Sequence, residues 1–200
     1  CRDDCRLTFG PTVVTARGGE YRMCWCAGGY ACSLTEHYRV DIGRFTLVGP
    51  SPLSQDRTCV SGQSCNFDSF LGQHLVQQYT DAGLYASISD SLAILDTCGT
   101  QDVISRSPSD YFSSQARSSG SSYLFSTLVT VAGGTYQLCW CPSVGQERAQ
   151  AGQRAVLRDY TPWKRNPGHC ENGADFLVTL GSVTLIGPAP NSQDRTCVSG

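Results

Sequence analysis

The feature that most constrains the fold of this chain is an internal repeat. Residues 49–62 return almost unchanged as residues 187–200, at an offset of 138 positions. An upstream block, residues 18–26, returns as residues 133–141 at an offset of 115. Self-similarity at such spacings is the sequence signature of repeated structural units. We therefore expect two related units, and the difference between 138 and 115 places 23 extra residues in the second.

The pattern inside the copied blocks is that of paired β-strands. Apolar and polar residues alternate over residues 127–131, Gly133 and Gly134 follow, and alternation resumes over residues 135–141. Two alternating segments joined by a tight glycine turn predict a β-hairpin. The first copy has the same order, with its glycine turn at Gly18 and Gly19. The fold class that we expect is all-β, built from tandem, disulfide-stapled, immunoglobulin-like β-sandwich repeats.

The expected units follow the copied blocks. We place the first unit at residues 1–62, shortened at its N-terminus, and the second at residues 63–200. The boundary falls where one copied block ends. The second unit carries insertions near residues 100–122 and 142–168. Because the chain opens on a cysteine and has no signal peptide, we expect a mature product or a piece of a longer array.

Cysteine is the most informative residue type in this composition. Twelve cysteines accompany only three histidines, a ratio that favours disulfides over zinc and hence an extracellular setting. Aligning the copies gives a six-cysteine unit whose sixth position in the second copy falls past Gly200. We expect disulfides among Cys5, Cys24, Cys26, Cys32, Cys59, Cys65, Cys98, Cys139, Cys141 and Cys170.

The expected pairing joins neighbouring cysteines within each unit. We choose Cys5–Cys24 and Cys26–Cys32 for the first unit, with Cys5–Cys26 and Cys24–Cys32 as the alternative. Cys98–Cys139 and Cys141–Cys170 are the matching bridges of the second. The glycine-containing loop between Cys59 and Cys65 is short enough to close. Cys1 and Cys197 are left over, and we expect them to form bridges between units.

Several function classes find no support in the sequence. A net charge of −2 supplies no basic field for nucleic acid, and no apolar run is long enough to span a membrane. The three histidines are scattered and no catalytic motif surrounds them, so we expect no enzyme. The Cys-x-Cys spacing differs from that of zinc sites, so we expect no metal or other cofactor.

The insertion at residues 142–168 is the candidate interface of the second unit. It holds five basic and two acidic residues, and aromatic residues lie near its end. Tryptophan and arginine dominate protein interfaces, which favours a docking arm. The alternatives are a loop folded over its own sheet and a sugar-binding platform on the tryptophan. The candidate interface residues are Tyr160, Trp163, Lys164 and Arg165.

Three motifs resemble a known group of repeats. These are Gly-x-Tyr-x-x-Cys-Trp-Cys, ending at Cys26 and Cys141, Thr-Leu-(Val/Ile)-Gly-Pro, ending at Pro50 and Pro188, and the Cys-Val-Ser-Gly-Gln-Ser-Cys motif that begins at Cys59. Together they are similar to the cysteine-rich repeats of very large surface proteins of alveolate protists. The resemblance implies an extracellular, modular protein.

The function that we expect is therefore structural. We interpret the chain as an extracellular building block of a filament, a flagellar hair (mastigoneme-like) or a surface coat, assembled through repeat-to-repeat contacts and disulfides. Its expected partner is itself, as a homopolymer or a longer tandem array, and glycans are further candidates. The alternative is an adhesion or carbohydrate-binding module of a cell-surface protein. We expect neither nucleic-acid binding nor membrane insertion.

Overall fold

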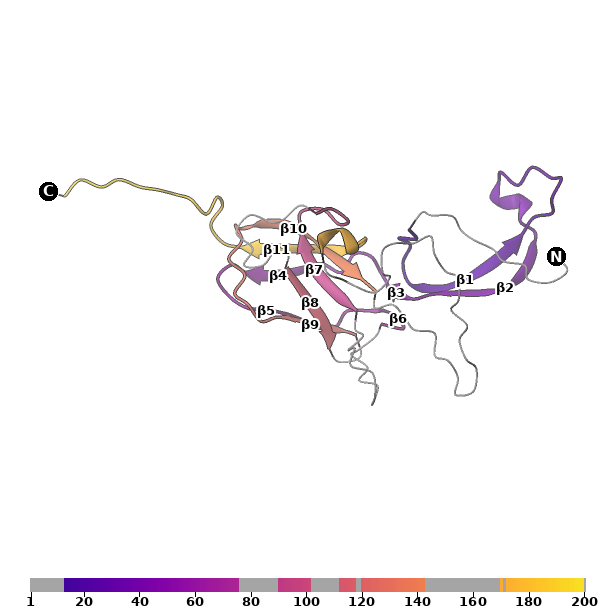
Figure 1. Ribbon diagram of the computed structural model, residues 1–200, viewed down its shortest axis with the longest axis horizontal. Coiled ribbons are helices and arrows are strands. Elements are labelled where there is room, and N and C mark those ends of the chain that lie inside the picture. Colours follow the sequence, from indigo (N-terminus) through magenta and orange to yellow (C-terminus); the bar gives the residue numbers. More distant parts are fainter. Residues whose placement is uncertain are drawn as a thin grey trace.

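The computed structural model describes residues 13–75, 90–101, 112–117, 120–142, 170 and 172–199. These residues form strands and turns, with two short 3-10 helices as their only helical segments. The expected all-β class is therefore confirmed. The strands belong to one large sheet and two small ones (Figure 1).

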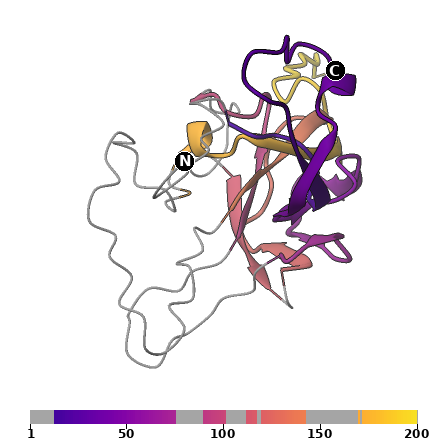
Figure 2. The ribbon, with the colours of Figure 1, turned by 90° about the vertical axis from the view of Figure 1, so that its right-hand side faces the viewer.

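The N-terminal hairpin is one of the small sheets. It is not the hairpin expected across Gly18 and Gly19, because residues 13–16 form no strand, and the one expected across Gly133 and Gly134 is absent for the same reason, since residues 127–131 form no strand. Strand β1 (Gly19–Trp25) pairs antiparallel with β2 (Val40–Leu47), and the register shifts by one residue between Met23 and Cys24. The 3-10 helix η1 (Thr35–His37) lies in the long connection between them. Figure 2 looks from the end that carries this hairpin, which projects toward the viewer in front of the larger sheet.

The large sheet contains seven strands in the order β4-β11-β10-β7-β8-β9-β5. All neighbouring pairs are antiparallel except β4 and β11, which run parallel. The strands are β4 (Arg57–Val60), β5 (Cys65–Phe67), β7 (Ser91–Leu95), β8 (Phe112–Arg117), β9 (Ser122–Phe125), β10 (Gly134–Cys141) and β11 (Val178–Ile186).

This sheet curves until its two edges meet. Strands β4 and β5 stand at opposite ends of the strand order, yet a disulfide joins Cys59 on one to Cys65 on the other, with 5.9 Å between their Cα atoms. The curved sheet encloses the larger hydrophobic core. Its buried members include Phe125, Leu138, Leu180, Val183, Tyr123, Phe67 and Leu92.

A smaller core lies on the other side of the central strands. Leu95, Cys139, Cys141 and Phe176 are buried there. Phe176 follows the 3-10 helix η2 (Gly173–Asp175), whose N-cap Asn172 accepts a hydrogen bond from the Ala174 backbone N–H. The disulfides Cys98–Cys139 and Cys141–Cys170 attach Cys98 and Cys170, which lie outside the strands, to this core.

The described residues contain four of the expected disulfides. Besides the three already named, Cys26 is joined to Cys32, which excludes the alternative pairings of these two residues. The expected bridge between Cys5 and Cys24 is not formed. Cys24 is a free thiol, and it lies exposed at the register shift of β1. Cys197 is free and exposed as well. Cys1 and Cys5 lie outside the described residues.

The large sheet crosses the expected unit boundary at Gly62. Strand β4 precedes that residue, but it pairs with β11, more than a hundred residues later. The connection from the hairpin to β4 is short. It contains β3 (Gly49–Pro50), which pairs with β6 (Gly72–Gln73), a strand that comes later in the chain. The copied block of residues 49–62 therefore belongs to the sheet of the copy that follows it.

The C-terminal copy of the same block lies apart from any sheet. Residues 187–199 contain no strand, and they extend away from the sheet at the end of the molecule opposite the β1–β2 hairpin (Figure 1). The peptide bonds Ser51–Pro52 and Ala189–Pro190 are both cis. The two copies of the block thus share a sequence but differ in surroundings.

Candidate assembly site

The two hairpins, β1–β2 and β10–β11, have the same local structure. Gly19 lies opposite Leu47 in the first, and Gly134 lies opposite Leu185 in the second, which are equivalent pairs in the repeat. The register shift falls at equivalent positions in both. Tyr21 and Tyr136 each donate a hydroxyl hydrogen bond to the carbonyl four residues earlier. Sequence similarity has therefore produced matching geometry.

Their surroundings differ sharply. Trp140 is 4% exposed, whereas its counterpart Trp25 is 48% exposed. Leu180 is 1% exposed, whereas its counterpart Ile42 is 46% exposed. The apolar face that β10–β11 buries against the rest of the large sheet is open to solvent on β1–β2. Exposed apolar faces of this kind commonly mark interaction surfaces.

The edge of β11 is covered by β4. Their parallel register places Arg57 opposite Val183 and Val60 opposite Ile186. Hydrogen bonds before and after the paired strands extend the contact: the Gln55 N–H donates to the Leu180 carbonyl at 3.0 Å, and the Ser61 N–H donates to the Ile186 carbonyl at 2.9 Å. Residues 55–61 therefore dock along β11 over its whole second half.

A carboxylate fixes the position of this docked segment. One oxygen of Asp56 accepts hydrogen bonds from the Ser182 backbone N–H at 2.7 Å and from the Ser182 hydroxyl at 2.8 Å. These bonds lower the pKa of Asp56 below its ordinary value, since the backbone and then the hydroxyl donor favour the charged form. The contact is therefore stronger when Asp56 is ionised.

Gln55 anchors the segment from the other side. Its side-chain amide donates to the carbonyls of Pro52 and Leu71, and its side-chain oxygen accepts from the Leu71 N–H at 2.8 Å. The residue is buried. Its backbone approaches Gly181 so closely that a Cβ there would lie 2.8 Å from Gln55 atoms. Glycine at position 181 thus permits the docking.

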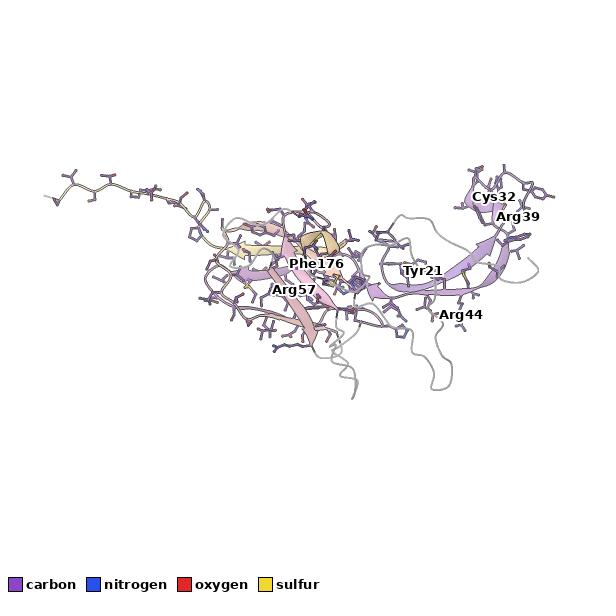
Figure 3. The ribbon with its side chains drawn as sticks, in the orientation of Figure 1. Tyr21, Cys32, Arg39, Arg44, Arg57 and Phe176 are labelled. Atoms are coloured by element: carbon purple, nitrogen blue, oxygen red, sulfur yellow. A yellow bond between two sulfur atoms is a disulfide. The ribbon has the colours of Figure 1, made fainter. Side chains whose placement is uncertain are left out.

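Arg57 completes the docked segment. Its guanidinium donates to the carbonyls of Asp68 and Ser69 and lies 4.2 Å from the centre of the Phe70 ring (Figure 3 labels Arg57). Cation–π contact of this kind adds to the packing of an apolar residue. The Gln-Asp-Arg sequence therefore makes three different contacts with the second copy.

The C-terminal copy of this sequence is fully exposed. Residues 192–199 have no partner strand among the described residues. Gln193 nevertheless donates to the Pro190 carbonyl at 2.8 Å, and Arg195 donates to the Asp194 carbonyl at 2.9 Å. The equivalent bonds in the docked copy run from Gln55 to Pro52 and from Arg57 to Asp56. The free segment therefore keeps local bonds of the docked one.

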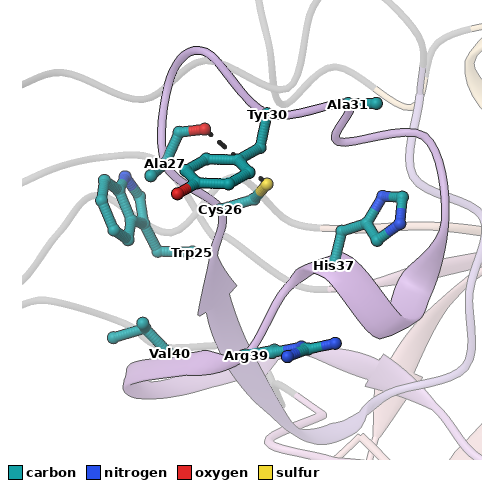
Figure 4. A pocket seen from close by; sticks show the side chains of 8 residues that line it. All are labelled: Trp25, Cys26, Ala27, Tyr30, Ala31, His37, Arg39 and Val40. Atoms are coloured by element: carbon teal, nitrogen blue, oxygen red, sulfur yellow. Dashed lines mark hydrogen bonds between the residues drawn. The ribbon is translucent and has the colours of Figure 1, made fainter.

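A hollow of about 470 Å³ lies at the tip of the β1–β2 hairpin (Figure 4). Trp25 and Tyr30 stand on one side, and His37 and Arg39 stand on the other. Nδ1 of His37 is buried without a hydrogen-bond partner among the described residues. The Cys26–Cys32 disulfide holds the loop that carries Tyr30. Aromatic rings beside polar groups suit a small polar ligand.

The described part of the chain offers no metal cluster of three or more histidine, cysteine, aspartate or glutamate side chains. No helix in that part has the length and apolar character needed to cross a membrane. The predicted interface residues Tyr160, Trp163, Lys164 and Arg165 lie outside the described residues. Comparisons with protein-family models, with curated proteins and with solved structures find no match for this chain.

Sequence reasoning missed the docking residues Gln55, Asp56 and Arg57. The signal was present, because Ser-Gln-Asp-Arg-Thr-Cys-Val-Ser is identical at residues 54–61 and 192–199. Identity over eight consecutive positions sets this segment apart within the copied block, although it does not indicate which strand the segment pairs with.

Proposed function

We propose that this protein is a structural building block of an extracellular assembly such as a filament, a flagellar hair or a surface coat. Its units would be tandem, disulfide-stapled, immunoglobulin-like sandwiches that contact one another directly. Disulfides held in a reducing cytosol are uncommon, so the four bridges support an oxidising, extracellular setting.

The observation that carries this proposal is the difference between the two hairpins. One has its apolar face buried by neighbouring strands, and the other presents the matching face to solvent. A sheet that exposes such a face and edge is prone to pairing with another chain. Controlled pairing is what a filament or coat subunit requires.

The experiment is sedimentation velocity of the full chain over a wide range of concentration, with negative-stain electron microscopy of the fastest species. We expect concentration-dependent oligomers with a regular repeat along their length. A monomer at every concentration would contradict the proposal. Electrophoresis with and without reductant then tests the predicted role of Cys197, since a covalent ladder should collapse on reduction and should be absent from Cys197→Ser.

The second candidate function is glycan binding at the hairpin tip. The exposed indole of Trp25 beside Tyr30 and Arg39 favours it, because sugars stack on aromatic rings and bond to polar groups at their rim. Saccharide titration followed by calorimetry tests this candidate, with Tyr30→Ala expected to abolish any heat of binding. A response that survives Tyr30→Ala would place the ligand elsewhere.

A further inference from the structure

We propose that the outer edge of β2 accepts residues 192–199 of a second copy of this chain as a parallel strand, in the register in which β4 pairs with β11. This inference rests on the proposed function and names the contact that would build the assembly. It places an acceptor edge at one end of the molecule and a donor segment at the other.

The donor has a docked equivalent inside the same chain. Residues 54–61 carry the sequence of residues 192–199 and pair with β11 through β4. The free copy already makes the local hydrogen bonds from Gln193 to Pro190 and from Arg195 to Asp194. Its Val198 is 89% exposed. A segment already shaped for docking loses less conformational entropy when it binds.

The acceptor has a docked equivalent too. Strand β2 matches β11 in sequence register and in its pairing with the preceding strand. Among the described residues, β2 pairs only with β1, so no strand lies along its other edge. Gly43 occupies the position of Gly181, and the nearest atom to a Cβ there would be the end of the Met23 side chain at 3.7 Å. Among the described residues, only the end of the Met23 side chain comes within 4 Å of that position, so the space that Gln55 fills beside Gly181 is available to Gln193 there.

The equivalent register predicts specific contacts. The Gln193 N–H would donate to the Ile42 carbonyl, as that of Gln55 does to Leu180. Thr196 and Val198 would lie opposite Thr46 and Val48. Main-chain hydrogen bonds along a free strand edge supply the affinity in this mode of recognition, and side chains supply the selectivity.

One substitution between the copies changes the group that the docked aspartate would contact. The position of Ser182, which bonds to Asp56, is occupied by Arg44 in the first hairpin. Arg44 is exposed on the surface of β2 (Figure 3). Asp194, the equivalent of Asp56, would therefore meet a guanidinium in place of a hydroxyl. Arginine with carboxylate forms stronger, charge-assisted hydrogen bonds than serine with carboxylate.

The position of the two surfaces sets the symmetry of the contact. The hairpin and residues 192–199 lie at opposite ends of the long axis (Figure 1). A donor at one end and an acceptor at the other form a heterologous interface, which generates rings or open filaments rather than a closed dimer. Head-to-tail chains of copies are the expected product.

A charge-swap series in sedimentation velocity tests this inference. The full chain carries Cys24→Ser and Cys197→Ser throughout, so that disulfide exchange cannot produce oligomers. Asp194→Arg and Arg44→Asp are each expected to lower the association constant by at least about tenfold, because each places like charges together. An equal mixture of the two variants should recover association, since the donor segment of each variant then finds an acceptor of opposite charge on the other variant. Arg117→Asp is the matched control, because it makes the same change of charge at an exposed arginine of β8, outside the proposed contact.

Three outcomes would overturn the inference. Oligomers that are insensitive to both substitutions would mean that copies associate through another surface, and the proposed function would stand without this contact. Association that is lost in both variants but not recovered in the mixture would mean that the two residues do not meet. A monomer whose β2 amides are protected from hydrogen exchange at every concentration would mean that the chain covers its own edge. Circular dichroism of each variant excludes misfolding as the cause of lost association.

Discussion

The β1–β2 and β10–β11 hairpins have the same local structure but different neighbouring strands. They share register, tyrosine hydrogen bonds and the glycine contact at their start: Gly18 donates to the Pro50 carbonyl and Gly133 donates to the Pro188 carbonyl, both at 2.8 Å. Within the described part of the chain, only the second is covered by β4 on one edge and by β7 on the other. The comparison shows that hairpin geometry is set locally, whereas burial depends on which strands lie beside it.

The difference in burial predicts that Trp140 contributes far more to stability than its counterpart Trp25. Trp140→Ala should lower the free energy of unfolding of the large sheet by about 3–5 kcal/mol, since it removes a buried ring and leaves a cavity. Trp25→Ala, the same change at the equivalent exposed position, should cost no more than about 0.5 kcal/mol. Urea denaturation followed by circular dichroism measures both. Equal losses would show that Trp25 is buried in solution.

The disulfides give the next largest contrast. Replacing Cys98 and Cys139 by alanine should cost about 4 kcal/mol, because the bridge closes a 41-residue interval of the unfolded chain and ties the smaller core. Replacing Cys26 and Cys32 by alanine should leave unfolding of the large sheet unchanged, since that bridge lies at the tip of the exposed hairpin. Denaturation curves of the two double variants test this contrast. A comparable loss of stability in both would mean that the β1–β2 hairpin contributes to the stability of the large sheet.

The docked and free copies of the repeated segment offer a smaller and more specific contrast. Gln55→Ala should cost about 1–3 kcal/mol, because it removes the hydrogen bonds that this buried side chain makes with Pro52 and Leu71. Gln193→Ala removes the identical side chain from the exposed copy and should have no measurable effect on the monomer. Thermal unfolding of the two variants at low protein concentration makes the comparison.

The smallest expected effect is a dependence on pH. Because the pKa of Asp56 is lowered in the folded protein, its carboxylate stabilises the fold above its ordinary pKa of 3.8. This contribution is lost as pH falls below that value and through the folded pKa. Asp56→Asn should therefore flatten the acid side of the stability profile, whereas Asp194→Asn should leave the monomer profile unchanged. A profile for Asp56→Asn that matches the wild type would show that the Ser182 contact does not hold the carboxylate.

The sequence predicted only part of the local structure. Alternation and the glycine turns predicted hairpins that do not form, because residues 13–16 and 127–131 are not strands and β1 and β10 pair instead with β2 and β11. Alternation did predict β1 and β10 themselves, and short or aligned cysteine spacings predicted the bridges of Cys26, Cys59, Cys98 and Cys141 with their partners. These features depend on residues near one another in the chain or on copies that can be aligned. The immunoglobulin-like arrangement of whole units stays a prediction.

The long-range pairing could not be predicted from the same patterns. Strand β4 has the period of any short strand, and nothing in its residues says that it pairs with β11 rather than with the hairpin before it. The free state of Cys24 was also beyond reach, since its counterpart Cys139 is paired with Cys98. In both cases the partner is chosen by tertiary packing, which sequence spacing does not encode.

The parallel contact between β4 and β11 also has a mechanical consequence. Strand β4 comes at the start of the large sheet and β11 at its end, so tension applied along the chain pulls these two neighbours in opposite directions. The load then acts in shear, and the hydrogen bonds between the strands must break together rather than one after another. A protein built from such sheets in series would resist stretching, with its rupture force set by the bonds of residues 55–61.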